Sequence, residues 1–338
     1  MTDDPETRSR YDVYGIGNAL VDIEVEATAE ELAGLGVEKG LMTLIEPDRQ
    51  AHLLEHLGGK QHKRTGGGSA ANTIMALAHL GARCFYSCRV ADDDSGHFFA
   101  GDMREAGVGT NAHDDKGDGQ STGTCLVMVT PDADRTMNTC LGISSTLSPA
   151  QIVEAELAEA AYLYIEGYLV STPNSLETAQ EGRRLAKKHG VKTAMTFSDP
   201  AMVKFCRDGL DELLGDGVDV LLCNEEEALG FTGQSSLEAA GDALKERASL
   251  LSITLGPRGS RIWDGNTWLE IAPHTVTAVD SNGAGDLFAG AFLYGITQGH
   301  GAEVAGKLAS LSSATLVTRF GARLDKDTLQ ELRGRVLG

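Results

Sequence analysis

A seven-residue segment late in the chain combines glycine, alanine and acidic residues in an order suited to holding an anion beside a proton acceptor. Residues 280–286 read DSNGAGD and run directly into an apolar helical stretch at 287–297. Small residues at a helix N-terminus let backbone N–H groups approach a ligand closely, and the helix dipole favours an anion there. Asp286 would lie at the edge of that anion site, placed to accept a proton from an attacking hydroxyl group. The alternative is a capping carboxylate after a flexible turn.

Two earlier segments also place polar groups at the start of a helix or the end of a strand. Residues 66–72, GGGSAAN, open a predicted helix and offer close backbone approach with serine and asparagine as hydrogen-bonding groups. A helix start capped by serine is the alternative. Residues 18–22, NALVD, follow the first predicted strand, and their amide and carboxylate could bracket vicinal hydroxyl groups. Otherwise this segment is a turn into the next strand.

Two later segments follow predicted strands at the edge where open α/β sheets bind ligands. Residues 224–227, NEEE, carry three carboxylates that could position Mg²⁺, commonly through its waters. Acidic residues in a first helical turn also stabilise the helix without any metal. Residues 254–259, TLGPRG, offer a hydroxyl group and amides to a nucleotide phosphate, or form a plain turn.

Several familiar motifs are excluded or disfavoured. The dinucleotide fingerprint fails because Leu20 stands where its third glycine is needed, and neither Gly-Lys pair, at 59–60 or 306–307, is followed by serine or threonine. Residues 52–56, HLLEH, match a zinc pattern. Leucines in and next to this segment supply a buried stripe, so an amphipathic surface helix is the preferred interpretation.

The elements that must position these groups alternate between strand-like runs and amphipathic helices, which is typical of βα units around a mainly parallel sheet. Predicted strands are 11–17, 84–90, 162–165, 191–196, 218–223 and 250–254, and predicted crossover helices are 70–80, 173–189 and 237–246. Gly81 and Gly190 are expected to end two of the helices. Segments 21–44 and 122–139 alternate like strands instead. They predict a small sheet inserted into the large domain, with the use of a lid.

Composition limits the partners of the chain. Its 338 residues include 29 basic and 49 acidic side chains, a formal net charge of −20 that repels nucleic acid and anionic membrane surfaces. The six cysteines include no Cys-x-x-Cys pair and no dense framework, which fits a reducing cytoplasm. No secretory leader and no apolar run of about 18 residues is recognised. We therefore expect a cytoplasmic protein without nucleic-acid or membrane partners.

In their order along the chain, these motifs resemble the PfkB, or ribokinase-like, family of carbohydrate and nucleoside kinases. The resemblance extends from about Tyr11 to Ala322 and is most specific at the late GAGD segment. Within the family the chain looks most like the adenosine kinases, because of residues 17–22 (GNALVD), 224–228 (NEEEA) and the asparagine before Gly283. Residues 164–169, YIEGYL, resemble the segment that places an aromatic side chain near the nucleoside base in those enzymes.

The resemblance implies a role for each matching residue. Asp286 would be the general base for a 5′-hydroxyl group, and the amides of Gly283, Ala284 and Gly285 would form the hole for the transferring phosphoryl group. The positions that match substrate-binding residues are Asn18, Asp22, Gly67, Gly68, Ser69 and Asn72, and Tyr168 would stack on the base or simply fill the core. The positions that match ATP and metal contacts are Asn224 and Glu227, which organise the metal, and Thr254, Gly256 and Gly259. Arg135 matches a family arginine on the lid.

The family likeness also implies the fold and the reaction. It implies a three-layer α/β/α domain at 9–17, 63–110 and 141–338 with a mainly parallel central sheet, and a small β-sheet lid at 18–62 and 111–140. The reaction would convert adenosine to AMP with ATP and Mg²⁺, with K⁺ as a further candidate cation and a monomer or homodimer as the assembly. A sugar kinase acting on ribose or fructose, and a catalytically silent ligand-binding relative, are the alternatives. Ser281 stands where the family usually has threonine and keeps the hydroxyl group, whereas the alanines at 70 and 71 leave fewer groups to recognise the nucleoside, so the preferred acceptor stays open.

Overall fold

The computed structural model describes residues 9–40, 42–57, 59, 61–112, 119–131 and 135–338. Within these residues a nine-stranded sheet has the strand order β14-β13-β12-β11-β10-β9-β1-β5-β6. The pairs from β12 to β6 are parallel, whereas β13 and β14 add an antiparallel edge. The strands are β1 (Tyr11–Ile16), β5 (Cys84–Ser87), β6 (Gly109–Thr110), β9 (Ala160–Ile165), β10 (Lys192–Thr196), β11 (Val218–Asn224), β12 (Ala248–Thr254), β13 (Ser260–Trp263) and β14 (Trp268–Ile271).

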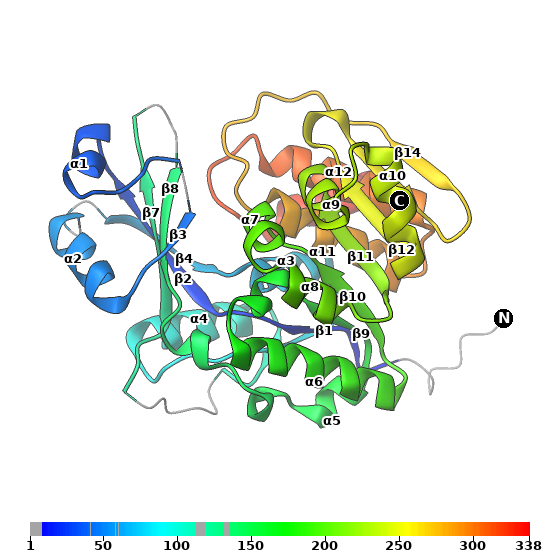
Figure 1. Ribbon diagram of the computed structural model, residues 1–338, viewed down its shortest axis with the longest axis horizontal. Coiled ribbons are helices and arrows are strands. Elements are labelled where there is room, and N and C mark those ends of the chain that lie inside the picture. The colour runs from blue at the N-terminus through cyan, green and yellow to red at the C-terminus, as the bar shows by residue number, and fades with distance from the viewer. Residues whose placement is uncertain (1–8, 41, 58, 60, 113–118, 132–134) are drawn as a thin grey trace.

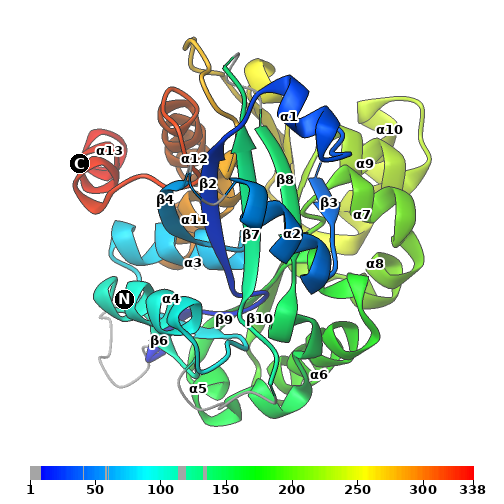
Figure 2. The same cartoon turned by 90° about the vertical axis from the view of Figure 1, so that its left-hand side faces the viewer.

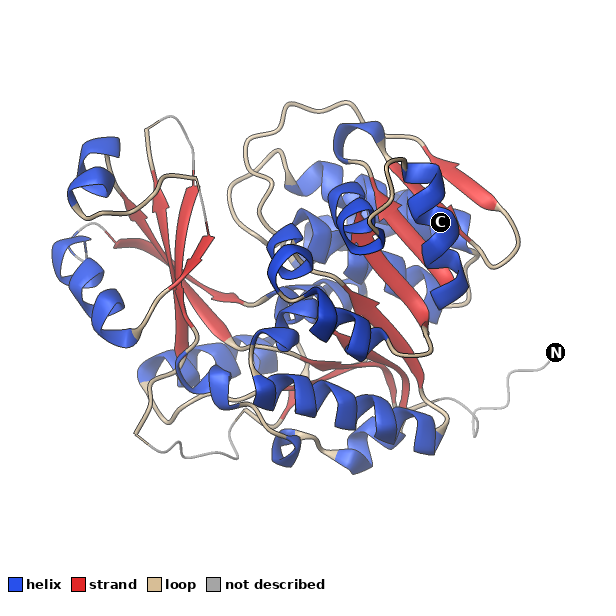
Figure 3. Cartoon of the chain, viewed as in Figure 1, coloured by secondary structure: helices blue, strands red, loops and turns tan. Residues whose placement is uncertain are grey.

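Helices cover both faces of this sheet (Figures 1 and 3). One face carries α3 (Ser69–Leu80), α4 (Asp94–Glu105), α11 (Ala284–Thr297), α12 (Ala302–Leu316) and α13 (Lys326–Leu337). The other face carries α5 (Glu154–Ala158), α6 (Pro173–His189), α7 (Pro200–Phe205), α8 (Arg207–Leu214), α9 (Glu225–Thr232) and α10 (Leu237–Leu244). Strand residues alternate between the two cores: Val13 packs into the first, and its neighbour Tyr14 into the second.

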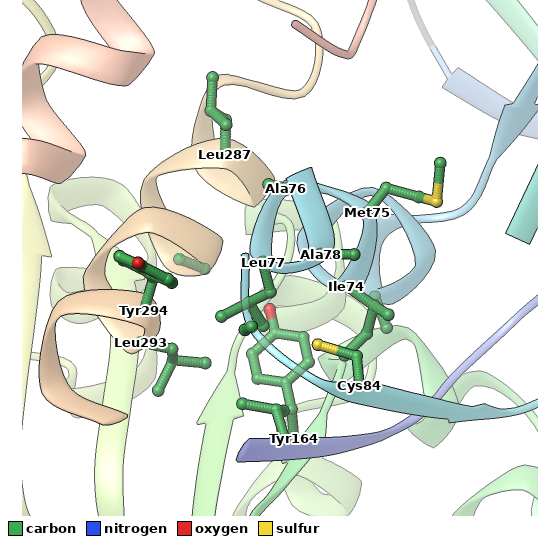
Figure 4. Packing of buried hydrophobic residues seen from close by; sticks show 14 of the residues in the cluster. Ile74, Met75, Ala76, Leu77, Ala78, Cys84, Tyr164, Leu287, Leu293 and Tyr294 are labelled. Carbon is green, nitrogen blue, oxygen red and sulfur yellow. The ribbon is translucent and has the colours of Figure 1, made fainter. Parts of the chain in front are cut away.

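Apolar packing joins the two helices that will carry the chemistry. Helix α3 is buried along most of its length, and α11 contacts both α3 and α12. Figure 4 shows Leu77 of α3 facing Leu293 and Tyr294 of α11, with Tyr164 of the sheet beneath them. Because these side chains fill the first core, the N-terminal ends of the two helices are held at fixed positions above the sheet.

A second, five-stranded sheet stands beside the large domain, with the strand order β3-β8-β7-β2-β4 (Figure 1). Its strands are β2 (Leu20–Glu26), β3 (Met42–Leu44), β4 (Gln61–Gly67), β7 (Gly123–Val129) and β8 (Arg135–Cys140). Helices α1 (Ala29–Gly34) and α2 (Pro47–Leu57) cover its outer face, as Figure 2 shows, and bury a small core of their own. Only three residues separate β1 from β2, and one residue separates β4 from α3.

The predicted α/β class, the parallel large sheet and the smaller second sheet are confirmed. The six strands and three crossover helices lie close to their expected ranges, and Gly81 and Gly190 end α3 and α6 in the left-handed conformation. The strand-like interpretation of 21–44 was wrong for α1, because Thr28 and Glu31 form a capping box that starts a helix there. The domain boundary that was expected between residues 62 and 63 falls inside β4, and all of β4 belongs to the small sheet.

Candidate active site

A cavity of about 570 Å³ lies between the carboxyl ends of the large sheet and the small sheet. Residues that follow or end β1, β9, β10, β11 and β12 line one side of it, and residues of the small sheet line the other. The sequence-predicted residues that line the cavity are Asn18, Asp22, Gly68, Ser69, Asn72, Tyr168, Asn224, Glu227, Thr254, Gly283, Ala284, Gly285 and Asp286. The fold therefore brings together segments that are up to 268 residues apart in the chain, from 18 to 286.

The DSNGAGD segment forms a tight turn into α11. Gly283 is the N-cap and has a φ of 72°, and a Cβ atom there would collide with the backbone of Ala322. Only glycine meets both conditions without strain. The following Ala284 and Gly285 are the first residues of α11, where N–H groups have no partner within the helix, and both residues line the cavity. The Ala284 N–H donates to the Ser281 carbonyl oxygen at 3.2 Å within the turn. A Cβ atom added to Gly285 would meet no protein atom within 4 Å.

The Asp286 carboxylate is held by two side chains of α3. Ser69 Oγ donates to Oδ1 at 2.6 Å, and Asn72 Nδ2 donates to Oδ2 at 2.9 Å. Thr73 Oγ1 also donates to the Asp286 carbonyl oxygen at 3.2 Å. Burial raises the pKa of Asp286 to about 6, against the lowering effect of the Ser69 and Asn72 hydrogen bonds. This arrangement offers a fixed carboxylate of increased basicity beside a row of helix N-terminal amides.

Glu166 is a site residue that sequence reasoning quoted within a motif but did not select. Its carboxylate is fully buried and accepts hydrogen bonds from the Asn18 N–H and Asn18 Nδ2, both at 2.8 Å, and from the Ala70 N–H at 2.6 Å. It thus ties the β1–β2 connection to the first turn of α3. An acidic residue immediately after the apolar strand β9 was the available signal.

Asn224 and Glu227 form a capping box at the start of α9. Asn224 Oδ1 accepts from the Glu227 N–H at 2.8 Å, while the Glu227 carboxylate accepts from the Asn224 N–H at 2.9 Å and from Nδ2 at 2.8 Å. Burial raises the pKa of Glu227 to about 7. The helix-start interpretation of this motif is therefore confirmed, and both residues also line the cavity, where their amide and carboxylate oxygens are of the hard type that Mg²⁺ prefers.

Four predicted residues do not line the main cavity. Gly256 and Gly259 have φ values of 57° and 90° and shape the turn after β12, of which only Thr254 reaches the cavity. Gly67 gives room to the Asp22 carboxylate, which a Cβ atom would overlap. Arg135 of β8 pairs with Asp280 at 3.0 Å and lines a small neighbouring cavity. The ATP-binding roles of Gly256 and Gly259, the substrate-binding role of Gly67 and the catalytic role of Arg135 stay predictions.

Apolar side chains of the lid form one wall of the main cavity. This lid wall consists of Leu20, Met42, Leu44, Cys125, Met137 and Leu141. Leu44 is 49% exposed although it is a large hydrophobic residue. Tyr168 lines the cavity from the large domain, and its hydroxyl group donates to Asp199 Oδ2 at 3.2 Å. Apolar and polar side chains in the lining of one cavity suit a ligand that has both an apolar and a polar part.

Comparison with known proteins identifies the family to which this chain belongs. The model of the pfkB family carbohydrate kinases matches residues 41–329, most of the chain. The chain belongs to this family. PfkB kinases are phosphotransferases with an alcohol acceptor, so the resemblance read from the motifs and the enzyme class are both confirmed.

Relatives of this PfkB kinase carry both sugar-kinase and adenosine-kinase names. It is 34% identical to the structure of adenosine kinase from Sinorhizobium meliloti, with a TM-score of 0.87 over 96% of this chain and 99% of that one. It is 32% identical to a probable sugar kinase from Rhizobium etli CFN 42, with a TM-score of 0.88 over 97% and 98%. It is 28% identical to ribokinase from Haemophilus influenzae over 82% of this chain and 89% of that protein. The family is shared, and the acceptor is not fixed by these names.

Two features outside the site complete the description of this PfkB kinase. His52, Glu55 and His56 place their donor atoms within 4.8 Å of one another, but all three are exposed on α2 and none lines the cavity. Within the described part of the chain no fourth ligand joins them. A search of the same residues finds no helix that is both long and apolar enough to cross a membrane.

Proposed function

We propose that this kinase transfers the γ-phosphoryl group of ATP to the 5′-hydroxyl group of a nucleoside, with adenosine as the preferred acceptor and AMP as the product. The observation that carries the proposal is that the apolar lid wall and Tyr168 line the same cavity as the polar side chains of Asn18 and Asp22. A purine has two apolar faces that such a wall would cover, whereas a free sugar offers hydroxyl groups on all sides. The 34% identity to an adenosine kinase supports the same choice.

The proposed mechanism assigns the proton and the charge to separate groups. The Asp286 carboxylate accepts the proton of the 5′-hydroxyl group as its oxygen bonds to the γ-phosphorus, and the bond from that phosphorus to the bridging oxygen breaks to release ADP. The N–H groups at residues 283–285 hold the transferring phosphoryl group at the positive end of α11. Asn18 and Asp22 hold the ribose hydroxyl groups.

The same proposal gives the metal a defined place. Both Glu227 oxygens already accept hydrogen bonds from Asn224. Asn224 and Glu227 would therefore hold Mg²⁺ through its bound waters rather than by direct coordination. When bound, the ion neutralises part of the phosphate charge. The structure of a putative ribokinase II from E. coli with ATP and Mg²⁺ shares the fold at a TM-score of 0.79. We expect turnover of this chain to require Mg²⁺ and to stop when the ion is chelated.

The proposal is tested by measuring ADP formation with adenosine, other nucleosides, ribose and fructose, with and without Mg²⁺ and K⁺. We expect kcat/KM to be highest for adenosine. Replacing Met137 of the lid wall with glutamine should raise the KM for the nucleoside, while any residual turnover of ribose should stay at its wild-type rate because ribose leaves that wall uncovered. A higher kcat/KM for ribose or fructose than for every nucleoside would reject the proposal.

A sugar kinase is the second candidate, favoured by the 28% identity to ribokinase over 89% of that protein. Asn18, Asp22 and Asp286 fit either acceptor, because both present vicinal hydroxyl groups next to a primary alcohol. The two candidate functions differ in their use of the lid wall, because a nucleoside base would cover it and a sugar would not. The substrate panel therefore distinguishes them without any change in the assignment of the base.

Replacing Asp22 with alanine should weaken acceptor binding. Asp22 of β2 lines the cavity, and a hydrogen bond from a hydroxyl group to a carboxylate contributes about 1.5–3 kcal/mol, which corresponds to roughly 10–150-fold in affinity. We expect the KM of the acceptor to rise by about that factor while the KM of ATP changes little. Steady-state kinetics with each substrate varied in turn measure both. An unchanged acceptor KM would remove Asp22 from the substrate site.

The rate should fall on the acidic side of neutrality. The pKa of Asp286 is raised to about 6, so below that pH the carboxylate is protonated and cannot accept the acceptor's proton. We expect kcat/KM to decline at least tenfold per pH unit well below pH 6 and to be level above about pH 8, where Glu227, with a pKa of about 7, is ionised as well. A pH profile with saturating Mg²⁺-ATP tests this. A profile that is flat down to pH 5 would contradict the role of Asp286 as the base.

A further inference from the structure

Arg323 connects the catalytic carboxylate to parts of the fold that do not line the main cavity. It lies in the loop after α12, and its side chain is 16% exposed. Its Nε donates to Asn72 Oδ1 at 2.7 Å, and its Nη1 donates to Asp102 Oδ2 of α4 at 2.6 Å. Because Asn72 Oδ1 is occupied by this bond, the Asn72 Nδ2 is turned toward Asp286 Oδ2, to which it donates at 2.9 Å.

The lid is built to leave room for this ion pair. A Cβ atom on Gly66 of β4 would overlap the Asp102 carboxylate and come within 3.0 Å of the Arg323 guanidinium. The Arg323 Nη2 is buried and has no hydrogen-bond partner among the residues that the structure describes. Arg323 and Asp22 also line the same small cavity of about 50 Å³ between the lid and the large domain. The guanidinium therefore reaches Asp286 through Asn72 and shares the small cavity with Asp22, and among the described residues Asp102 is the acidic side chain with which it forms an ion pair.

We propose that Arg323 is a positioning residue for the phosphoryl transfer: it fixes the Asn72 amide that holds Asp286, and it supplies the positive charge that the Asp286 and Asp22 carboxylates face. The inference rests on the proposed role of Asp286 as the base. Arg323 does not line the main cavity and acts on the reaction through these neighbours. Its positive charge lowers the pKa of both carboxylates against the larger raising effect of burial.

Other ionisable groups contribute to the field around Asp286. These groups, from each neighbouring element, are Asp22 of β2, Glu166 after β9, Tyr164 of β9, Tyr168 after β9 and Arg323 itself, with Arg135 and Glu24 facing Asp22. Apart from the two arginines, each of them is neutral or negative at neutral pH. Among these groups Arg323 is the cation that lowers the pKa of Asp286, so its removal should raise that pKa.

The test is the pH profile of kcat/KM for the Arg323→Gln enzyme. Loss of the positive charge should move the acidic limb of this pH profile to higher pH by about one unit, because a nearby opposite charge lowers the pKa of a carboxyl group by about 1–3 units. The defect should then be about tenfold greater at pH 5.5 than at pH 8.5, where the base is ionised in both enzymes. Arg183→Gln is the matched control, since that half-buried arginine binds backbone carbonyls of Leu213 and Gly217 far from the cavity.

The Asp102→Asn variant provides a second test of the inference, which can be used if the Arg323→Gln variant does not fold. The asparagine oxygen can still accept from Arg323, but the charge that neutralises the guanidinium is gone, so the acidic limb should move to lower pH, the opposite direction. Two results would overturn the inference. One is a folded Arg323→Gln enzyme whose kcat/KM falls at the same acidic pH as that of the wild type. The other is an Asp102→Asn enzyme whose kcat/KM falls at the same pH as, or at a higher pH than, that of the wild type. Failure of the proposed base is separate, because it would appear as retained turnover in the Asp286→Asn enzyme.

Discussion

Replacement of Asp286 with asparagine is expected to lower kcat by about 10²–10⁴-fold, the usual contribution of a positioned proton acceptor. The amide has nearly the same shape, and it can accept from Asn72 Nδ2 and donate to Ser69 Oγ, so both observed contacts have a replacement. Binding of ATP and of the acceptor should therefore persist. Single-turnover kinetics and equilibrium binding by calorimetry measure the two effects separately.

The same substitution should stabilise the protein at neutral and alkaline pH. The pKa of Asp286 is raised from 3.8 to about 6 on folding, so the folded state binds the proton more tightly than the unfolded state. Its ionised form therefore costs up to about 3 kcal/mol of stability above pH 6, and the cost disappears below about pH 4, where both states are protonated. We expect a higher melting temperature for the variant at pH 8 and little difference at pH 4.

Asp264→Asn is a suitable control for this pair of measurements. Asp264 is exposed in a turn far from the cavity, and hydrogen bonds from the Asn266 and Thr267 N–H groups lower its pKa. Its replacement should leave kcat unchanged and should not stabilise the protein at pH 8. Near-normal turnover by Asp286→Asn would show that another group accepts the proton.

Replacement of Gly285 with alanine should lower kcat by about 10²–10³-fold without lowering the free energy of unfolding. A Cβ atom at this position touches no protein atom within 4 Å, yet Gly285 lines the cavity, so the methyl group would occupy space proposed for the phosphoryl group. Loss of one oxyanion-type donor costs about that factor. Within a helix, alanine is also more stable than glycine by about 1 kcal/mol. Kinetics and thermal unfolding of the purified variant test both expectations.

Gly334→Ala provides the matched control on another helix. Gly334 lies inside α13, and a Cβ atom there also meets no atom within 4 Å. This variant should gain similar stability and keep full activity, because it lies away from the cavity. If Gly285→Ala retained wild-type kcat, the anion site at the start of α11 would have to be placed elsewhere.

The sequence predicts the local parts of this site because each part is encoded in a few adjacent residues. Gly283 meets a conformational demand that only glycine satisfies, and residues 224–227 place an asparagine three residues before a glutamate, the spacing of a capping box. Buried strands such as 218–223 are visible as apolar runs. These signals do not depend on the rest of the fold.

The remaining parts depend on contacts between distant residues. Glu166 binds Asn18 across 148 residues, and Arg323 binds Asn72 across 251, so no local spacing reveals either bond. Met42 and Met137 look like core residues in the sequence, and only the fold shows that they line a cavity. Residues 63–67 of strand β4 were assigned to the large domain because the start of the strand, residues 61–65 (QHKRT), lacks an apolar alternation.

The connections between the two sheets lie beside the proposed acceptor site. Asn18 lies in the three-residue β1–β2 connection, Gly68 is the single residue between β4 and α3, and Glu166 ties the first connection to the first turn of α3. When a lid turns about such connections, residues beside them hardly move, whereas the opposite ends of its strands, here Glu26 of β2 and its partner Val129 of β7, move farthest. Under the proposed function, we therefore expect the lid to open for the exchange of ADP and ATP while Asn18 and Asp22 keep their contacts with the hydroxyl groups of the acceptor.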